Sequence, residues 1–277
     1  RLRRARCDLA ILLTNSFRSA FTSLLAGISR RVGYARDGRG LLLTDRLKAP
    51  RRGIKWSPVP ALDYYNSLAA HVGCESPGDQ LRRRLARQQQ AIDTRLAGQD
   101  ASRPLVVLNP GANFGSAKCW PAEKYAAVSD ALVRQAGARV VASLGPKENA
   151  IAQTLRSSAR EPLDIFIDPP LGLGPLKALV RRSDLLITND TGPRHFAAAF
   201  GRPVITVFGS SDPAWTDTRY SDERIVKLNL DCQPCMQRVC PLGHHDCMRK
   251  LEPAGVIEAA VAILKSNRAA SLAGAHR

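Results

Sequence analysis

The sequence predicts an α/β protein with two domains built on parallel sheets. In the second half of the chain, apolar runs of strand length alternate with stretches that have helical periodicity. A chain of 277 residues with 44% hydrophobic content is long enough to bury two cores. The composition turns polar over residues 98–104, and a more regular alternation begins after it. We therefore expect a first domain over residues 1–100 and a second over 101–277.

The first domain is expected to begin with a strand, a helix and a second strand, an order that indicates a parallel sheet. A stretch rich in Gly, Pro, Lys and Arg follows, and its lack of periodicity predicts a long functional loop. Two helices then complete the domain. The expected elements are strand 8–13, helix 17–26, strand 31–34, loop 37–60, helix 63–72 and helix 80–97.

The second domain is expected to be a doubly wound parallel sheet, because its strands are mostly separated by helical stretches. Right-handed crossovers place the strand ends that precede helices on one edge of such a sheet, where ligands bind. The loops after these strands are therefore candidate binding segments. The expected strands are 105–108, 139–144, 163–167, 185–188 and 204–208.

Charge and hydropathy narrow the class of protein. No apolar stretch approaches the roughly 18 residues that a membrane span needs. The opening Arg1–Arg6 leads into a strand-like segment and lacks the apolar core of a signal peptide, so we expect a cytoplasmic chain that lacks its natural start. A net charge of +17 favours polyanionic partners, although an arginine-rich composition explains the charge equally well.

The segment from Asn189 to His195 is the most informative motif. An apolar run leads into it and an alanine-rich helical run follows, which predicts a strand, a tight turn and a helix start. Such a turn directs backbone N–H groups and the positive end of a helix dipole at a phosphate. We expect Asp190 to cap the helix or orient a ligand hydroxyl, and Thr191 and Gly192 to present N–H groups. His195 either faces the ligand or packs in the core.

A second motif runs from Asn109 to Pro121, between a strand and a helix. Gly111 and Gly115 permit close backbone approach to a ligand, and Lys118 supplies a positive charge that could neutralise a departing diphosphate. The alternative is a surface lysine beside a buried tryptophan. The motif lacks the Gly-Lys-Ser/Thr ending of a Walker A loop. After the next strand, Glu148 either accepts hydrogen bonds from ribose hydroxyls or only complements the helix dipole.

Four of the 7 cysteines fall in one short window, at Cys232, Cys235, Cys240 and Cys247. Four thiols at this spacing could hold one tetrahedral metal ion. The second pair lacks the Cys-x-x-Cys spacing of a zinc ribbon, and free thiols are equally compatible with a reducing cytoplasm.

Taken together, the motifs resemble the bacterial lipopolysaccharide heptosyltransferases of glycosyltransferase family 9, most closely the heptosyltransferase II type. The resemblance covers nearly the whole chain. The matching segments are 15–19, 31–34, 109–112, Lys118, 120–121, 188–195, Gly209 and 212–213.

The resemblance implies a GT-B-like fold, with two Rossmann-like domains of which the N-terminal one is incomplete. It implies transfer of heptose from ADP-L-glycero-D-manno-heptose to the lipid A inner core, with inversion, without a metal ion and without a cofactor. The C-terminal domain would hold the donor, with Lys118 as the catalytic group at the donor phosphates. The implied donor-binding residues are Gly111, Ala112, Lys118, Glu148, Asp190, Thr191, Gly192 and His195.

Members of this family begin with a strand and a glycine-containing loop whose aspartate is the base, and the few residues before the first strand here cannot supply them. We therefore assign no catalytic base. The resemblance also implies work at the cytoplasmic face of the inner membrane, in contact with its anionic surface. Arg18, Arg36, Arg39 and the basic run 48–52 are the expected anionic contacts.

Three other functions remain open at this point. A non-catalytic nucleotide-sugar binder would suit the absent base loop, and a transferase of a different activated sugar would use the same motifs. A nucleic-acid-binding protein would suit the charge and the cysteine window, but no Phe, Tyr or Trp lies between Cys232 and Cys247 to stack on bases. We therefore expect no nucleic-acid partner.

Overall fold

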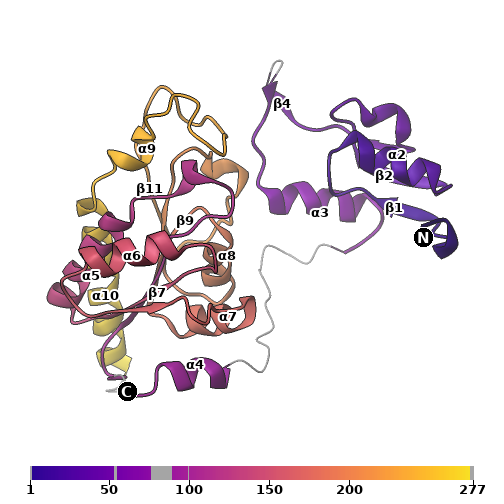
Figure 1. Ribbon diagram of the computed structural model, residues 1–277. Helices are drawn as coiled ribbons and strands as arrows, with labels where there is room; N and C mark the ends of the chain where they lie inside the picture. Colours follow the sequence, from indigo (N-terminus) through magenta and orange to yellow (C-terminus); the bar gives the residue numbers. More distant parts are fainter. Residues whose placement is uncertain (1, 53–54, 76–88, 99, 275–277) are drawn as a thin grey trace. The chain divides into compact units, whose positions relative to one another are not determined.

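The computed structural model describes residues 2–52, 55–75, 89–98 and 100–274. The chain forms two compact units, one of residues 1–80 with 213–218 and one of residues 81–212 with 219–277. Figure 1 shows both units with their labelled elements. Both contain parallel strands with helices packed on them, as the sequence predicts. The assignment of acceptor and donor roles to two domains stays a prediction.

The first unit contains a small parallel sheet in the order β1-β2-β3. The loop predicted over 37–60 is wrong in several places. Residues 39–42 form the short helix η1, residues 45–47 form β3 and pair with β2, and residues 51–52 and 55–56 form β4 and β5, which pair with each other. The residues of β3 are largely polar, so only the pairing partner reveals the strand. The elements are α1 (Leu2–Ala5), β1 (Leu9–Ile11), α2 (Phe17–Leu25), β2 (Arg30–Tyr34), η1 (Arg39–Leu42), β3 (Asp45–Leu47), β4 (Arg51–Arg52), β5 (Lys55–Trp56) and α3 (Ala61–His71).

Arg39 lies inside the first unit. Its side chain is fully buried, and it donates hydrogen bonds to the Tyr34 carbonyl at 3.0 Å and to Asn15 Oδ1 at 3.0 Å. The Tyr64 hydroxyl donates to the same Asn15 oxygen, and the rings of Tyr34 and Tyr64 stack with centroids 3.8 Å apart. The expectation that Arg39 contacts an external anion is therefore wrong, because its donors tie the loop after β1 to the core.

The second unit is a six-stranded parallel sheet in the order β11-β10-β9-β6-β7-β8. All five predicted strands are present, and β11, which the sequence analysis missed, extends the sheet. Of the predicted helix 80–97, residues 89–95 form α4, and residues 80–88 lie outside the described part of the chain. The strands are β6 (Leu105–Asn109), β7 (Arg139–Ser143), β8 (Leu163–Phe166), β9 (Leu185–Asn189), β10 (Val204–Val207) and β11 (Glu223–Val226).

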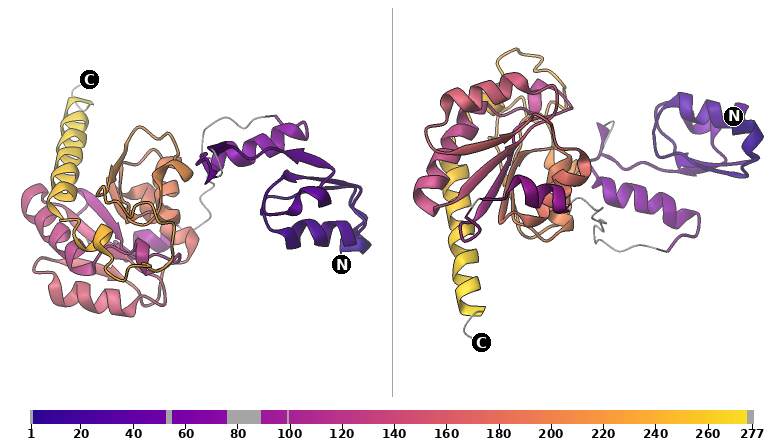
Figure 2. Two further views of the ribbon diagram at one scale, coloured as in Figure 1. Left: turned by 90° about the horizontal axis from the view of Figure 1, so that it is seen from above. Right: turned by 60° about the horizontal axis from the view of Figure 1, so that its bottom comes forward.

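Helices cover both faces of this sheet, and a hydrophobic core lies under each layer. One layer consists of α5 (Ala122–Ala136), α6 (Asn149–Ser158) and α10 (Ala254–Gly274), and α10 runs along the outside of the unit in Figure 2. The other consists of α4 (Gln89–Arg95), α7 (Leu173–Arg182) and α8 (Gly192–Ala199). Three short helices complete the description, η2 (Ser116–Lys118), η3 (Pro213–Trp215, assigned to the first unit) and α9 (Asp246–Arg249).

In the described part of the chain, no helix combines the length and the apolar composition required to cross a bilayer.

Candidate functional site

The strand order places a topological switch point between β6 and β9. The chain proceeds from β6 outward through β7 to β8, and then returns to the other side of β6 to form β9, β10 and β11. In doubly wound sheets, ligands bind beyond the carboxyl ends of the strands at such a point. A cavity of ≈ 560 Å³ lies there, lined by residues at and after the ends of β6, β7 and β9 and by residues of the segment 171–176, which follows β8.

Six of the predicted donor-binding residues line this cavity, namely Gly111, Ala112, Glu148, Asp190, Thr191 and Gly192. Lys118 is not part of the lining, but its ammonium contacts the carboxylate of Asp190, which is. His195 lies in the first turn of α8, is half-buried and is also not part of the lining. The three loops singled out from the sequence thus meet at one edge of the sheet.

Side-chain amides hold the loop after β6 against its neighbours. Asn109 donates to the Ser143 carbonyl at 2.9 Å, and Asn189 donates to the Pro110 carbonyl at 2.6 Å. The Asn189 oxygen accepts a hydrogen bond from the buried Tyr125 hydroxyl at 3.0 Å. The ends of β6, β7 and β9 are therefore linked to one another by side chains as well as by the sheet.

Glu148 immediately precedes α6, and its carboxylate oxygen Oε2 accepts a hydrogen bond from the Gly145 N–H at 2.8 Å. The same carboxylate lies so close to Gly111 that a Cβ at position 111 would overlap it. A side chain at position 111 would therefore displace the Glu148 carboxylate from its present position. Glu148 lines the cavity and also forms a local hydrogen bond. Both predicted roles, contact with a ribose and support of the start of α6, therefore stay predictions.

Asp190 lies at the end of β9, with a side chain that is only 4% exposed. Lys118 donates to its Oδ2, as does the Ser211 hydroxyl at 2.7 Å, and Arg194 donates to Oδ1 at 3.1 Å. Burial opposes ionisation of Asp190, but the hydrogen bonds and charges of Lys118, Ser211 and Arg194 outweigh it and hold its pKa below the ordinary value. Asp190 is thus held as a carboxylate beside the cavity.

The start of α8 faces the same cavity through Thr191, Gly192 and Pro193. Thr191 does not cap the helix with its side chain, because its hydroxyl lies 3.1 Å from the Thr188 hydroxyl and 3.3 Å from the Asn189 carbonyl. The positive end of the helix dipole is therefore not satisfied by a capping side chain at the cavity, an arrangement that attracts anions.

The sequence analysis missed a buried ionic group behind Asp190. Arg194, which is 1% exposed, donates to both carboxylate oxygens of Glu223 on β11, each at 2.8 Å. Thr206 on β10 donates to the same carboxylate at 2.6 Å. Arg194 stands four residues after Asp190, a spacing that could have indicated the contact, but the position of Glu223 follows only from the strand order.

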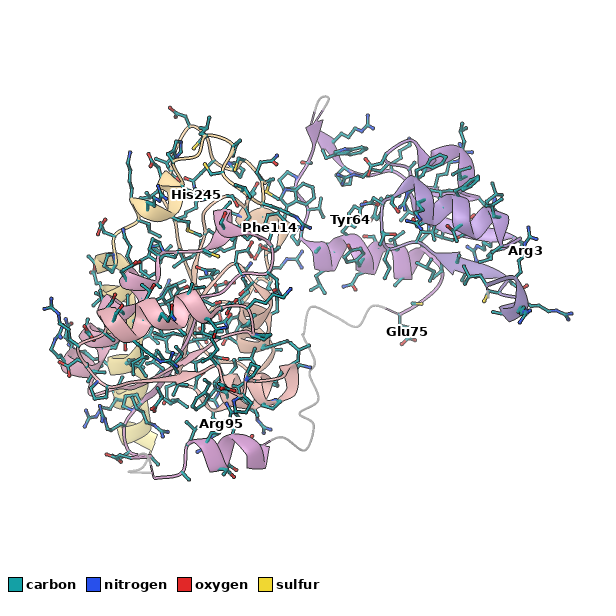
Figure 3. All side chains as sticks on the ribbon, viewed as in Figure 1. Arg3, Tyr64, Glu75, Arg95, Phe114 and His245 are labelled. Carbon is teal, nitrogen blue, oxygen red and sulfur yellow. The ribbon has the colours of Figure 1, made fainter. Side chains whose placement is uncertain are left out.

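A cation–aromatic stack lies beside the cavity. Phe114, labelled in Figure 3, lines the cavity, with the Lys118 ammonium 4.7 Å and the Arg238 guanidinium 5.3 Å from its ring centroid. Arg238 belongs to the cysteine-containing loop 232–247, and its carbonyl accepts a hydrogen bond from the Ala117 N–H at 3.1 Å. A Cβ on Gly115, whose φ is 151°, would overlap this carbonyl. The cysteine-containing loop thus supports the Lys118 loop.

The cysteines of this loop are free thiols. Burial raises the pKa of the Cys247 thiol, and the neighbouring Cys235, Cys232 and Cys240 raise it further. Across the described residues, no group of three or more His, Cys, Asp or Glu side chains is placed so that it could hold a metal ion.

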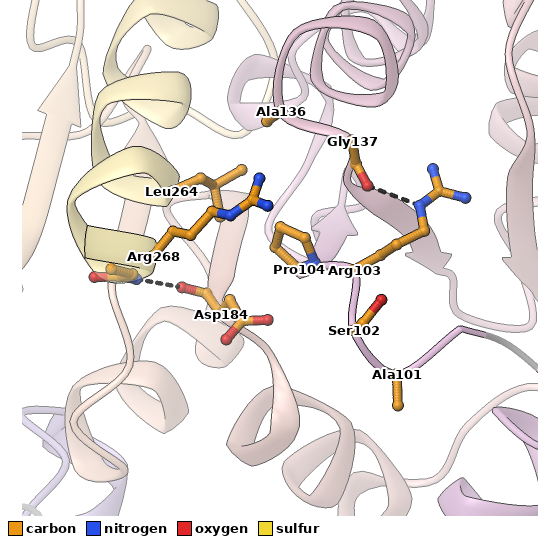
Figure 4. A pocket seen from close by; sticks show the side chains of 10 residues that line it. Ala101, Ser102, Arg103, Pro104, Ala136, Gly137, Asp184, Leu264 and Arg268 are labelled. Carbon is orange, nitrogen blue, oxygen red and sulfur yellow. Dashed lines mark hydrogen bonds between the residues drawn. The ribbon is translucent and has the colours of Figure 1, made fainter. Parts of the chain in front are cut away.

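A second cavity, of ≈ 440 Å³, lies at the opposite edge of the sheet, where β6 and β9 begin (Figure 4). Two of its charged side chains form hydrogen bonds to backbone groups of the same unit. Arg103 donates to the carbonyls of Gly137 and Ala138 at 2.7 and 2.8 Å, and Asp184 accepts from the Leu105 N–H at 2.7 Å. The cavity at the carboxyl edge is therefore the stronger candidate site.

The chain is similar to known glycosyltransferases in both sequence and structure. The sequence model described as "Glycosyltransferase family 9 (heptosyltransferase)" matches residues 1–245. The structure of Escherichia coli ADP-heptose lipopolysaccharide heptosyltransferase II superimposes with a TM-score of 0.72 at 25% identity, over 96% of this chain and 79% of that one.

The curated relatives include two heptosyltransferases. Lipooligosaccharide heptosyltransferase 2 of Campylobacter jejuni is 34% identical over 169 residues, which are 60% of this chain and 52% of the relative, so the match spans about half of that protein. Lipopolysaccharide heptosyltransferase 2 of Escherichia coli is 26% identical over 97% of this chain and 78% of its own length. With the family model matched over residues 1–245, the chain belongs to glycosyltransferase family 9, the heptosyltransferase family.

Proposed function

We propose that this chain is a glycosyltransferase that moves heptose from ADP-L-glycero-D-manno-heptose to the inner core of lipopolysaccharide, with inversion and without a metal ion. The observation that carries the proposal is the cavity at the switch point, where the start of α8 and the Lys118–Asp190 pair meet. Similarity to the Escherichia coli ADP-heptose lipopolysaccharide heptosyltransferase supports the choice of donor and acceptor.

The chemistry requires stabilisation of a departing diphosphate, because negative charge develops on ADP as the glycosidic bond to it breaks. The start of α8 and the ammonium of Lys118 supply positive potential at the cavity without rearrangement of the fold. Such preorganised electrostatic stabilisation is commonly the largest contribution to catalysis. We assign Lys118 to the leaving diphosphate, Glu148 to the ribose, and Gly111, Ala112, Asp190, Thr191, Gly192 and His195 to donor contacts.

The acceptor is expected to meet the first unit at the cytoplasmic face of the inner membrane. The net charge of +17 supports contact with an anionic surface, because both phosphorylated core sugars and acidic lipids attract cations.

Calorimetric titration of the 277-residue chain with ADP and ADP-heptose tests the donor site. Lys118→Ala should weaken ADP-heptose binding by about tenfold or more, because it removes the cation that faces the diphosphate, and Asp190→Ala should weaken it in the same direction, because it removes the carboxylate that holds Lys118. Lys265→Ala on α10 is the matched control, because this lysine is exposed and does not line the cavity, and it should leave the affinity unchanged.

A product assay with a heptose-bearing lipid A core acceptor then tests transfer. Product formation that depends on Lys118 supports the enzyme. Binding without transfer would instead indicate a nucleotide-sugar binder, and tighter binding of ADP-glucose than of ADP-heptose would indicate another sugar. Unchanged affinity in both variants would refute the donor site.

A further inference from the structure

The buried charges behind the cavity form a connected set. Glu223, Arg194, Asp190 and Lys118 follow one another through direct contacts, and their side chains are 6%, 1%, 4% and 13% exposed. Ionised groups removed from water carry a large desolvation cost, which close pairing only partly offsets. Apolar side chains would fill the space between β10, β11 and α8 at lower cost. The four buried charges therefore need a functional explanation, and the two nearest the cavity are Asp190 and Lys118.

Glu223 neutralises Arg194. The guanidinium meets both carboxylate oxygens at 2.8 Å, and Thr206 fixes the carboxylate from β10. The Nη1 group of the same guanidinium donates to Asp190 Oδ1 at 3.1 Å. Arg194 therefore orients Asp190 through one carboxylate oxygen, while Lys118 contacts the other.

Lys118 is held chiefly by Asp190, through Oδ2 and through the Asp190 carbonyl at 3.4 Å, and it lies over the ring of Phe114. Phe114 and Asp190 both line the cavity. A diphosphate in the cavity would draw the ammonium toward itself and weaken its contact with Asp190. The cost of that movement depends on how well the remaining partners, which include Arg194 and Ser211, stabilise the Asp190 carboxylate.

We propose that Arg194 and Glu223 are positioning residues that hold the Asp190 carboxylate, so that Lys118 can be shared between Asp190 and the β-phosphate of the donor. The proposal rests on the proposed function, because it takes the cavity as the donor site. Neither residue touches the donor, and both act through Asp190. The alternative is a purely structural tie between α8 and β11.

The two roles differ in their effect on nucleotide selectivity. A positioning role concerns the group that binds the β-phosphate, so its loss lowers the affinity for ADP more than the affinity for AMP. A structural tie that distorts the cavity lowers both affinities by similar factors, or leaves both unchanged when stability is restored.

The test uses two variants of the full chain. Arg194→Met combined with Glu223→Leu removes both charges and fills the space with apolar groups, a replacement that is often neutral for stability. Arg194→Lys retains the charge and the pairing with Glu223, but a single ammonium cannot replace the planar fork that reaches two carboxylates. Affinities for ADP and AMP are measured by calorimetry, and folding is checked by the thermal midpoint.

We expect the paired variant to keep a thermal midpoint close to that of the wild type while its preference for ADP over AMP falls by about tenfold. Arg194→Lys should reduce this preference in the same direction by a smaller factor. If the paired variant fails to fold, Arg194→Lys decides the question. An unchanged preference in the folded variants would overturn the proposal.

Lys118→Ala separates failure of this inference from failure of the proposed function. If Lys118→Ala lowers the preference for ADP and the Arg194 variants do not, the donor site stands and the positioning role is wrong. If Lys118→Ala has no effect on that preference, the donor site itself is wrong, and the positioning role falls with it.

Discussion

At Gly111, two loops of the site meet, because the Glu148 carboxylate occupies the space that a side chain would take. Sequence reasoning identified both residues from their positions after strands, and the structure brings them into direct proximity. Their dependence on each other could not be read from the sequence, because 37 positions separate residues 111 and 148.

Gly111→Ala should displace Glu148 from the Gly145 N–H and weaken ADP binding by roughly three- to tenfold. The thermal midpoint should fall only slightly, because Glu148 is half-buried and can rotate toward solvent. Calorimetry and thermal unfolding measure the two effects. Gly255→Ala, at a helical position with open space around it, is the control and should retain full affinity. Full affinity in Gly111→Ala would show that Glu148 takes no part in binding.

At the scale of elements, the loop 232–247 supports the site through its backbone. The Met236 N–H donates to the Ser210 carbonyl at 2.8 Å, and the Gln233 side chain donates to the Gly209 carbonyl at 2.7 Å. Together with the contact between Arg238 and Ala117, these bonds attach the loop to the segments after β10 and β6. The sequence analysis singled out this loop for its four cysteines, but these hydrogen bonds come from backbone groups and from the side-chain amide of Gln233.

The thiols of this loop should differ in reactivity. Backbone N–H groups, first that of His245, lower the pKa of the Cys240 thiol, whereas burial raises the pKa of Cys247. Because the thiolate is the reactive form, iodoacetamide at about pH 8 should modify Cys240 at least about tenfold faster than Cys247. Mass spectrometry of the peptides over time measures both rates.

Two controls accompany this measurement. Cys240→Ser should remove the fast reaction, and in denaturant the two cysteines should react at similar rates. Faster modification of Cys247 in the folded protein would contradict the arrangement of this loop.

The elements were predicted unevenly for a physical reason. The strands of the second sheet are mostly buried and read as apolar runs, and all five expected ones are present. Strands β3, β4, β5 and β11 were missed. Strands β3 and β11 each lie at a sheet edge and mix polar and apolar residues over only three or four positions, and β4 and β5 are only two residues long. Edge strands need fewer apolar residues, so their sequence signal is weak.

At the scale of the whole molecule, the net charge of +17 should strengthen association with anionic surfaces. We expect the protein to cosediment with vesicles that contain about 30% anionic lipid and not to cosediment with neutral vesicles. Binding should fall steeply as the salt concentration rises from about 50 to 500 mM, because salt screens exposed charges. Sedimentation and quantification of the pellet measure this, and salt-independent binding would point to apolar insertion instead.

The sequence by itself determined the α/β class, five of the six strands of the second sheet, the three loops of the candidate site and the family. These features depend on local patterns, namely apolar runs, glycines after strands and motifs of adjacent residues. Tertiary structure alone decided that Arg39 is buried, that Glu223 reaches Arg194, and that the cysteine-containing loop supports the Lys118 loop. Each of these contacts joins residues that strand order and packing bring together. The sequence does not reveal them, because the residue types involved could pair with many other partners.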